Sequence, residues 1–335
     1  RFAPIFYQAL GDRPRSDYIT NFDFDGDWVG DNNWNNAVNE TFPLKAFIYY
    51  SVAETSTHFF IHYAVFHPRD YKGGEVRGTL LSELLREGAK HGAKYDPTGL
   101  ADEATLAHEN DMEGAVVVVK RDGKNLDHSR VVFVETVRHN TFPRYQTGEA
   151  VPGVSVVTLE GQRPLLYIEP KGHGIEAFTN NPKQTAKKSF LRYVYGERAG
   201  DPDKVNVCRD LDITPCKTSV AYELIPLTTL WARAKGDTNP TYGVTFDYGE
   251  VTMSTSLNDG DAVEKKVNVG KMGCAFRGGV GGINMARPPW GWFDRESPDQ
   301  PLGSWFFDPA VRIKRDFNLD SNFSTSYVKL PFWAN

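Results

Sequence analysis

Residues 115–119, an alanine followed by four valines, constrain the fold of this chain more than any other feature. A short apolar run rich in β-branched residues is typical of a buried strand. Asp111 and Glu113 directly precede the run, and their spacing of two places both on one side of a strand. His108 lies three residues before Asp111, where a loop or bulge would bring it to the same side. We therefore predict that an imidazole and two carboxylates meet at the start of a buried strand, as in a divalent-metal site; the alternative is an acidic turn before a strand.

The composition predicts a folded chain with many turns. Its 335 residues are 40% hydrophobic, enough for a sizeable core in one large domain or two. The 30 glycines and 20 prolines favour many turns and few long helices. The formal net charge of -5, without a long run of either sign, argues against nucleic-acid binding. No stretch is apolar enough for a transmembrane segment.

Strand-like segments with turn signals between them predict a mostly β protein, with a central β-sandwich, short peripheral helices and a β-rich C-terminal extension. We divide the chain into residues 1–236, whose first 42 residues look loop-like, and a C-terminal block of residues 237–335; the alternative is one continuous domain. Strands are expected at 44–52, 57–67, 114–120, 130–138, 154–159, 165–169, 242–255 and 262–269. Short helices are expected at 79–91 and 228–235, and residues 183–199 are expected to form a helix or a surface segment.

The first residue and the cysteines bear on localisation. The chain begins at Arg1 rather than Met, as a mature form would after removal of a signal peptide. Cys208 and Cys216 are eight residues apart, an easy spacing for a disulfide, which leaves Cys274 over. The alternative is three reduced thiols in a cytosolic protein. Asn39 and Asn322 lie in glycosylation sequons. We expect a secreted or extracytoplasmic protein.

Three histidines are candidates for acid–base chemistry. His173 lies between two glycines just after a predicted strand that ends near Glu169, and the glycines leave space beside its imidazole. This suits a histidine that meets a ligand or activates a water molecule. His62 and His67 lie on opposite faces of the strand at 57–67. The alternatives are an incidental histidine in a surface turn and hydrogen-bonded interior histidines.

Aromatic and acidic clusters supply candidates for ligand binding. Residues 23–27 carry aspartates at alternate positions but lack the glycine and glutamate positions of an EF-hand, so a calcium-stabilised loop and an Asn/Asp turn both remain open. Trp28 and Trp34 either stack on a sugar or pin the N-terminal segment to the core. Trp290 and Trp292 either pack in the core or form a platform for carbohydrate or lipid. We include these four tryptophans and Glu169 as candidate substrate-binding residues.

The segment 107–113 resembles the hallmark Gly-His-Arg-His-Asp-Trp-Glu of the necrosis- and ethylene-inducing peptide-like proteins, and also the broader family annotated after a yeast vacuolar protein-sorting factor. The resemblance covers about residues 44–178. It implies a β-sandwich in which Asp70, His108, Asp111 and Glu113 surround a divalent cation. The chain departs from the hallmark at Ala107, Asn110 and Met112. Because oxygen ligands predominate, Ca²⁺, Mg²⁺ or Mn²⁺ is expected rather than Zn²⁺.

Two functions follow from these residues. The first is a secreted, metal-dependent hydrolase of an ester, phosphoester or glycosidic bond. His173 is the first candidate for its general acid or base, and His62 and His67 are the next candidates. The alternative is a non-enzymatic protein that binds a glycan, a lipid headgroup or a small phosphoester through the cation. A purely structural cation is a third possibility.

Overall fold

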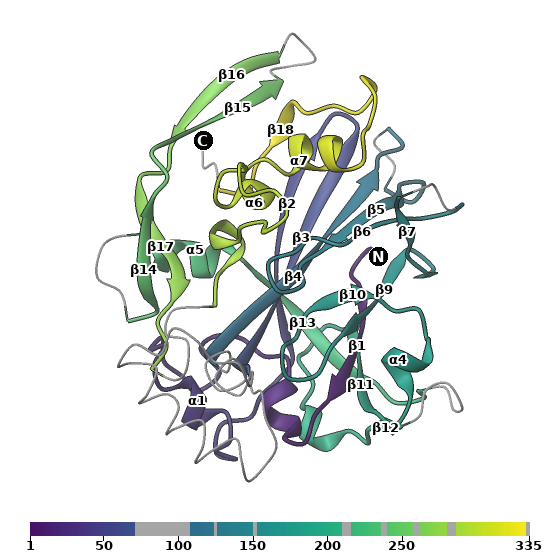
Figure 1. The fold of residues 1–335 in the computed structure, drawn as a ribbon, viewed down its shortest axis with the longest axis vertical. Coiled ribbons are helices and arrows are strands. Elements are labelled where there is room, and N and C mark those ends of the chain that lie inside the picture. Colours follow the sequence, from purple (N-terminus) through teal and green to yellow (C-terminus); the bar gives the residue numbers. More distant parts are fainter. Residues whose placement is uncertain are drawn as a thin grey trace, which may run out of the picture.

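A large curled β-sheet forms the body of the protein (Figure 1). The structure, a computed structural model, describes residues 1–70, 108–123, 126–149, 153–209, 216–235, 240–256, 262–279 and 286–332. Along the main path of the sheet the strands are hydrogen-bonded in the order β10-β9-β1-β11-β13-β2-β3-β4-β5-β6-β7. The helices that are described are short and peripheral. The predicted mostly β fold is therefore confirmed.

The strands of the sheet are β1 (Ile5–Leu10), β2 (Phe47–Thr55), β3 (His58–Asp70), β4 (His108–Lys120), β5 (Arg130–Thr136), β6 (Arg144–Gln146), β7 (Ser155–Val156), β8 (Leu159–Glu160), β9 (Arg163–Ile168), β10 (Ile175–Ala177), β11 (Ser189–Tyr195), β12 (Cys208–Arg209), β13 (Val220–Pro226), β15 (Glu250–Ser256), β16 (Ala262–Asn268) and β18 (Tyr327–Lys329). A second, two-stranded sheet pairs β14 (Tyr242–Asp247) with β17 (Lys271–Phe276). The helices are η1 (Pro14–Asp17), α1 (Asn33–Asn36), α4 (Pro182–Thr185), η2 (Pro202–Lys204), α5 (Thr228–Ala234), η3 (Pro289–Gly291), α6 (Ser304–Phe307) and α7 (Pro309–Asp316).

The long antiparallel pair β3–β4 is the axis of the fold. Its register runs without a shift from His58 opposite Lys120 to Asp70 opposite His108. Alternate valines of β4 enter two different apolar cores: Val116 and Val118 pack on one side, and Val117 and Val119 pack on the other. This explains the unbroken apolar run, because a strand that is buried on both faces needs no polar alternation.

The sheet curls until β10 meets the end of β5. Ile175 of β10 donates its backbone N–H to Val137 O at 2.9 Å, and Thr136 Oγ1 donates to Ile175 O at 2.6 Å. The enclosed space is filled from both halves of the sheet, by side chains that include Phe6, Val65, Val117, Leu166 and Tyr193. This closure brings the turn between β9 and β10 next to the start of β4.

Two segments differ from their predicted structure. Residues 5–10, expected to be loop-like, form β1 between β9 and β11, because Ile5, Phe6 and Ala9 are fully buried there. Within residues 183–199, expected to be a helix or a surface segment, Ser189–Tyr195 form β11, whose Phe190 and Tyr193 are also fully buried, and only residues 183–185 belong to a helix, α4. In both cases burial of apolar side chains outweighs the polar residues between them. The helix expected at 228–235 is confirmed as α5, and the one expected at 79–91 lies outside the described residues.

The C-terminal block packs on the outer face of β2–β5. Its buried aromatic residues, Trp290, Trp292, Trp305, Phe306 and Phe307, share one core with Phe60, Phe66, Val116 and Val118. Strand β18 joins the main sheet beside β2, and the hairpin β15–β16 runs along one side of the molecule (Figure 1). Cys208 and Cys216 form a disulfide, as their spacing allows, and Cys274 is free and buried.

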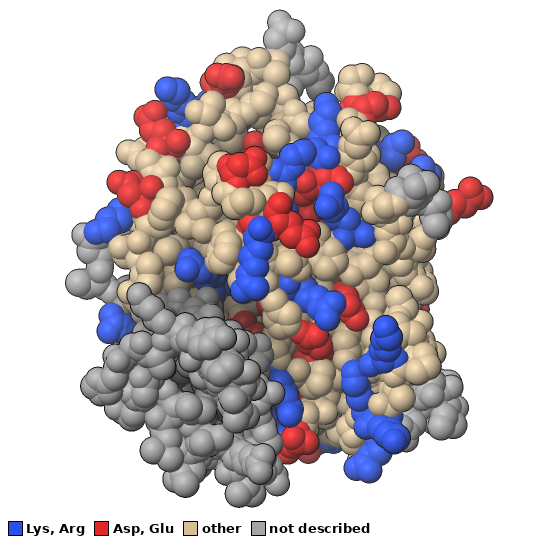
Figure 2. All heavy atoms as spheres, in the orientation of Figure 1, with Lys and Arg blue, Asp and Glu red and all other residues tan. Residues whose placement is uncertain are grey.

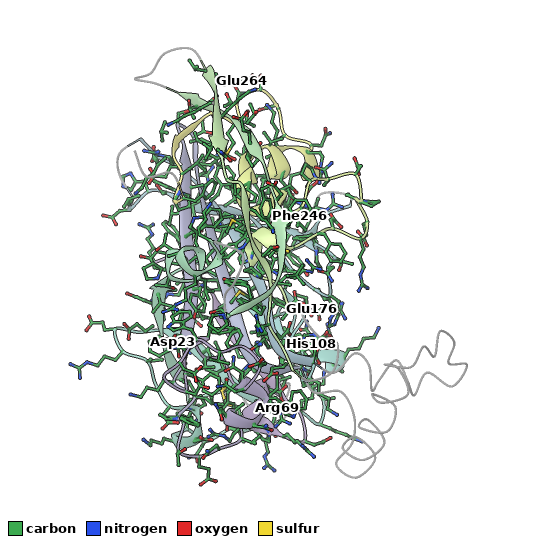
Figure 3. The ribbon with its side chains drawn as sticks, turned by 90° about the vertical axis from the view of Figure 1, so that its left-hand side faces the viewer. Asp23, Arg69, His108, Glu176, Phe246 and Glu264 are labelled. Carbon is green, nitrogen blue, oxygen red and sulfur yellow. A yellow bond between two sulfur atoms is a disulfide. The ribbon has the colours of Figure 1, made fainter. Side chains whose placement is uncertain are left out.

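Acidic and basic side chains are interspersed over most of the face shown in Figure 2, and basic side chains predominate at its lower right. In a view turned by 90°, Arg69, near the end of β3, and His108, at the start of β4, lie in the lower half of the molecule (Figure 3). None of the described helices is long and apolar enough to cross a membrane.

A buried ionic network links the C-terminal block to β5. Arg312 of α7 contacts Glu135 at 3.4 Å, Asp294 at 2.8 Å and Asp316 at 2.9 Å. Trp305 Nε1 donates to the other oxygen of Glu135 at 2.9 Å. Burial raises the pKa of Glu135 to about 8, although the charge of Arg312 opposes this.

We expect this network to make stability depend on the pH. Folding raises the pKa of Glu135 above its value in the unfolded chain. The protonated carboxyl therefore contributes fully to the stability of the folded state below the unfolded pKa, and this contribution is lost as the pH rises through about 8. Stability should therefore fall by a few kcal/mol, on the order of one per pKa unit, between about pH 5 and about pH 9. Urea denaturation at both values measures this loss, and Glu135→Gln should reduce it. An equal loss in the variant would assign the pH dependence to other groups.

Candidate functional site

The start of β4 has an irregular backbone that brings its polar side chains together. Asn110 has a left-handed φ of 59° and lies opposite Pro68, which has no N–H to donate to the ladder. The side chain of Asn110 is buried and donates to Gly30 O at 2.7 Å and to Arg277 O at 2.8 Å. At this kink the chain turns so that His108 and Asp111 line the same cavity.

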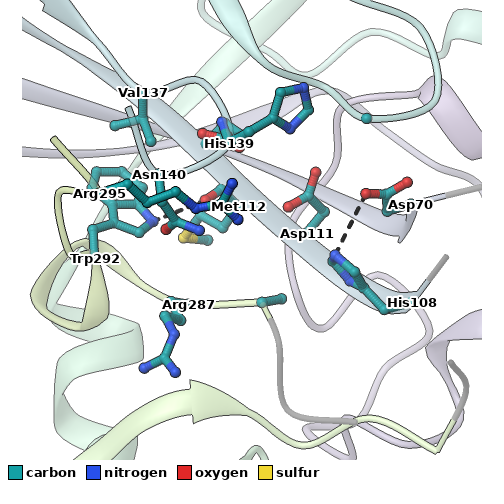
Figure 4. A pocket seen from close by; sticks show the side chains of 13 residues that line it. Asp70, His108, Asp111, Met112, Val137, His139, Asn140, Arg287, Trp292 and Arg295 are labelled. Atoms are coloured by element: carbon teal, nitrogen blue, oxygen red, sulfur yellow. Dashed lines mark hydrogen bonds and ion pairs between the residues drawn. The ribbon is translucent and has the colours of Figure 1, made fainter. Parts of the chain in front are cut away.

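This cavity has a volume of about 290 Å³ and contains both acidic and basic side chains. Figure 4 shows Asp70, His108 and Asp111 on one side of the cavity and Trp292 and Arg295 on the other, with the guanidinium of Arg287 turned away from these side chains. The cavity is lined by Asp70, His108, Asp111, Met112, Glu113, Val137, His139, Asn140, Gly172, Ala286, Arg287, Trp292 and Arg295. All four ligand positions implied by the sequence resemblance therefore face one cavity.

The His108 imidazole is oriented by the backbone. Its Nδ1 lies 2.8 Å from Asn110 O, so Nδ1 carries a proton and donates to this carbonyl. The other nitrogen, Nε2, lies 3.5 Å from Asp70 Oδ2 (Figure 4). A carbonyl that holds one ring nitrogen and leaves the other for a cation is the usual arrangement around metal-binding histidines.

Glu113 has one carboxylate oxygen without a hydrogen-bond partner. Its Oε1 accepts the backbone N–H of His139 at 3.1 Å, whereas Oε2 is buried and has no partner among the described residues. Burial, followed by the nearby charge of Asp111, holds the pKa of Glu113 well above its usual range. A buried oxygen without a partner is costly and calls for an explanation such as an ion.

His173 lies behind this cavity and holds Asp111 in place. Its Nδ1 is 2.9 Å from Asp111 Oδ2 and its Nε2 is 3.3 Å from Asp17 Oδ1, and the side chain is fully buried. Burial alone would lower the pKa of His173, but the bonds to Asp111 and Asp17 raise it to about 10. The charged imidazolium donates to both carboxylates and, at the same time, holds the pKa of Asp111 below its usual value.

His67 stacks on His173, with ring centroids 3.8 Å apart and nearly parallel planes. Burial, and then the charge of His173, keep the pKa of His67 well below its usual range. His67, Asp111 and His173 each place one potential ligand atom within 4.8 Å of the others, so they are a possible three-residue metal site. Both nitrogens of His173, however, already contact carboxylates. We therefore assign His67 and His173 to the support of the cavity, whereas Asp111 lines it.

The remaining predicted site residues lie elsewhere or have partners. His62 is buried in the core, where Nε2 bonds to Trp305 O at 2.9 Å. Trp290 is fully buried and does not reach the cavity, so it forms no rim. Glu169 pairs with Arg138 and His139 beside the cavity. The arginine side chains of Arg233 and Arg69 cover the rings of Trp28 and Trp34 at 4.1 and 4.0 Å, respectively, which fits a role in packing. Trp292 does line the cavity.

Five polar or charged residues of the site were not predicted from the sequence: Asp17, His139, Asn140, Arg287 and Arg295. His139 and Asn140 form a turn after β5 with φ of 51° and 60°. A polar pair directly after an apolar strand is a signal that could have identified this turn. Asp17 and the two arginines come from distant parts of the chain, and no spacing in the sequence links them to Asp111.

The comparisons with known proteins give limited similarity. No family model and no curated protein matches the chain. A structure described as a toxin fold for microbial attack and plant defence matches at 12% identity and a TM-score of 0.25, over 42% of this chain and 48% of that one. Necrosis and ethylene inducing protein 2 from the causal agent of cocoa's witches' broom disease matches at 14% identity and a TM-score of 0.28, over 53% of this chain and 65% of that one. The non-toxic HaNLP3 protein matches at 13% identity and a TM-score of 0.28, over 59% of this chain and 60% of that one.

These structural neighbours are of the class that the hallmark-like segment resembles, whereas none of the three is a vacuolar sorting protein. The chain spans less than two thirds of the length of each of them.

Proposed function

We propose that this protein binds the polar group of a glycan or lipid headgroup through a divalent cation and does not hydrolyse it. One observation carries the proposal: four potential ligands line one cavity, and one of them, Glu113, has a buried oxygen without a partner among the described residues. A cation would satisfy this oxygen and offset the repulsion between neighbouring carboxylates.

The donor set suits a hard cation. Asp70, Asp111 and Glu113 offer oxygens, and His108 offers Nε2 because its Nδ1 bonds to a carbonyl. Such a set favours Ca²⁺, Mg²⁺ or Mn²⁺ over Zn²⁺. When bound, the cation would supply open coordination positions for hydroxyl or phosphate oxygens.

Binding is supported better than hydrolysis because the cavity lacks the predicted base. Both nitrogens of His173 contact carboxylates, its side chain is fully buried, and it does not line the cavity. Neither His62 nor His67 lines the cavity. A general base must reach the proton that it removes, and none of these three residues does so in this arrangement.

The disulfide between Cys208 and Cys216 supports an oxidising compartment, and we propose that the protein is secreted or extracytoplasmic.

Binding to glycan arrays and to phospholipid vesicles, with and without chelator, tests the proposed function. We expect saturable binding that the chelator abolishes and that leaves the bound molecule chemically intact. Released product would favour the hydrolase instead. Loss of thermal stability on chelation without loss of binding would indicate a purely structural cation.

His173 should act as a positioning residue for the cation. We expect His173→Gln to weaken the cation affinity by roughly tenfold to a hundredfold, since residues that orient ligands have effects of this size. Calorimetric titration with Ca²⁺ or Mn²⁺ measures it, at a temperature where circular dichroism shows the variant folded. His58→Gln, a buried histidine at the opposite end of β3, is the matched control and should bind like the wild type. Equal cation affinities in the wild type and both variants would show that His173 does not position the cation ligands.

A further inference from the structure

A separate cleft of about 680 Å³ lies beside α7, at the end of β3 and β4 that is opposite the candidate cation site (Figure 1). We propose that this cleft binds a small aromatic carboxylate and that Lys120 and Arg130 hold its charged group. The inference goes beyond the proposed function and does not depend on it, because the cleft shares no lining residue with the cavity at Asp111.

The register of the sheet brings three nitrogen-bearing side chains together in this cleft. His58 of β3 lies opposite Lys120 of β4, and Lys120 lies opposite Arg130 of β5. Residues directly opposite each other on neighbouring strands lie on the same face of the sheet. All three residues line the cleft. One face of the sheet therefore presents an imidazole, an ammonium and a guanidinium group on three adjacent strands.

Lys120 and Arg130 have no acidic partner among the described residues. Both are exposed, and neither forms an ion pair there. The adjacent Arg121 differs, because it pairs with Glu54 at 3.6 Å and covers the ring of Phe59 at 4.6 Å. Like charges directly opposite each other in a sheet are destabilising. An anion that contacts both Lys120 and Arg130 would offset this repulsion through charge-assisted hydrogen bonds.

The acidic residue found among the described lining residues is engaged in its own loop. Asp320 Oδ1 accepts the backbone N–H of Asn322 at 2.8 Å, and Asp320 Oδ2 accepts a side-chain N–H of Asn322 at 3.3 Å. Lys120, Arg121 and Arg130 line the same cleft. The charged groups of the cleft therefore have an excess of positive charge, which favours an anionic ligand.

Aromatic side chains line the cleft next to these charges. The ring of Phe323 lies 4.3 Å from the imidazole of His58, and the ring of Phe133 lies 4.5 Å from that of Phe317 at the end of α7. Aromatic rings pack favourably against one another. The volume of the cleft lies in the range of sites for small molecules, which combine an apolar wall with a few polar groups. A ring that carries a carboxylate matches both parts of this cleft.

His58 adds a neutral hydrogen-bond donor to the cleft. Burial, followed by the charge of Lys120, lowers the pKa of His58 to about 4, so its ring is neutral near pH 7. Thr57 Oγ1 lies 2.8 Å from His58 Nδ1 and accepts the backbone N–H of Ser324 at 3.1 Å, which leaves its own proton for Nδ1. We therefore assign the ring proton to Nε2, which has no partner among the described residues and can donate to a ligand oxygen.

The test compares probes that share their rings or their charge. Calorimetric titration measures the binding of 2-naphthoate, of the neutral 2-naphthalenemethanol, of decanoate and of acetate to the full chain. We expect 2-naphthoate to bind roughly tenfold to a hundredfold more tightly than 2-naphthalenemethanol, as hydrogen bonds to a charged group imply. The double variant Lys120→Gln/Arg130→Gln should lose this preference. Lys183→Gln/Lys217→Gln, which removes two exposed charges outside the cleft, is the matched control and should retain it.

Each outcome supports or overturns the aromatic-anion site. Equal affinity for 2-naphthoate and 2-naphthalenemethanol in the wild type, or an unchanged preference in the cleft variant, would overturn it. Equal losses in the two double variants would assign binding to net charge and would also contradict it. Decanoate or acetate that binds as tightly as 2-naphthoate would contradict an aromatic ligand. A chelator should leave the affinity for 2-naphthoate unchanged; loss of binding would place the anion at the cation site instead of this cleft.

Discussion

Replacement of Arg312 by methionine is expected to lower the free energy of unfolding by about 3–5 kcal/mol, because it removes one partner from a buried ionic network. The guanidinium contacts Glu135, Asp294 and Asp316 at 2.8–3.4 Å, and its side chain is almost fully buried. Without Arg312, the two aspartates would remain close together with no opposing charge. Urea denaturation monitored by tryptophan fluorescence measures the loss.

The neighbouring Arg315 provides a matched control. It pairs with Asp316 at 2.7 Å, but its side chain is about one third exposed. Exposed ion pairs contribute about 0–1 kcal/mol, so Arg315→Met should have a small effect. If the two variants lost similar free energies of unfolding, the buried network would contribute no more to stability than the exposed ion pair.

Trp305→Ala should destabilise the protein by about 3–5 kcal/mol, as expected for removal of a buried tryptophan. Trp305 lies where α6 packs on β3 and β5: its ring centroid is 5.2 Å from that of His62 and 4.8 Å from that of Trp292. Its Nε1 also donates to Glu135. The variant would leave a cavity between the C-terminal block and the sheet, and urea denaturation would report it.

Trp305→Phe separates packing from hydrogen bonding. The phenylalanine retains most of the packing and loses the bond to Glu135, so a loss of about 1–2 kcal/mol is expected. We also expect a single unfolding transition in both variants, because the C-terminal block and the sheet share one core. Two separate transitions would indicate that residues 237–335 unfold on their own.

The sequence was most informative where local pattern determines local structure. The valine run predicted the buried strand β4, and its spacing of two predicted that Asp111 and Glu113 share a side. The position of His108 depended on an irregularity that the sequence allowed but did not locate. The structure places it at Asn110, whose positive φ and buried amide have no signature in a single sequence.

The parts that could not be predicted depend on contacts between distant segments. Asp17, which holds His173, and the arginines of the C-terminal block reach the site only because the sheet closes between β5 and β10. Strand β1 was missed for the same reason, because its position between β9 and β11 depends on tertiary contacts. His173 looked accessible because glycines flank it, yet the fold buries it completely.

The cation content of the purified protein tests the proposed site most directly. Elemental analysis after equilibration with Ca²⁺, Mg²⁺ and Mn²⁺ in turn should give one cation per chain for the wild type and none for Asp111→Asn. The exposed Asp299→Asn serves as the control and should retain the cation. A wild type that binds none of these ions, or an Asp111→Asn variant that binds as well as the wild type, would contradict the account.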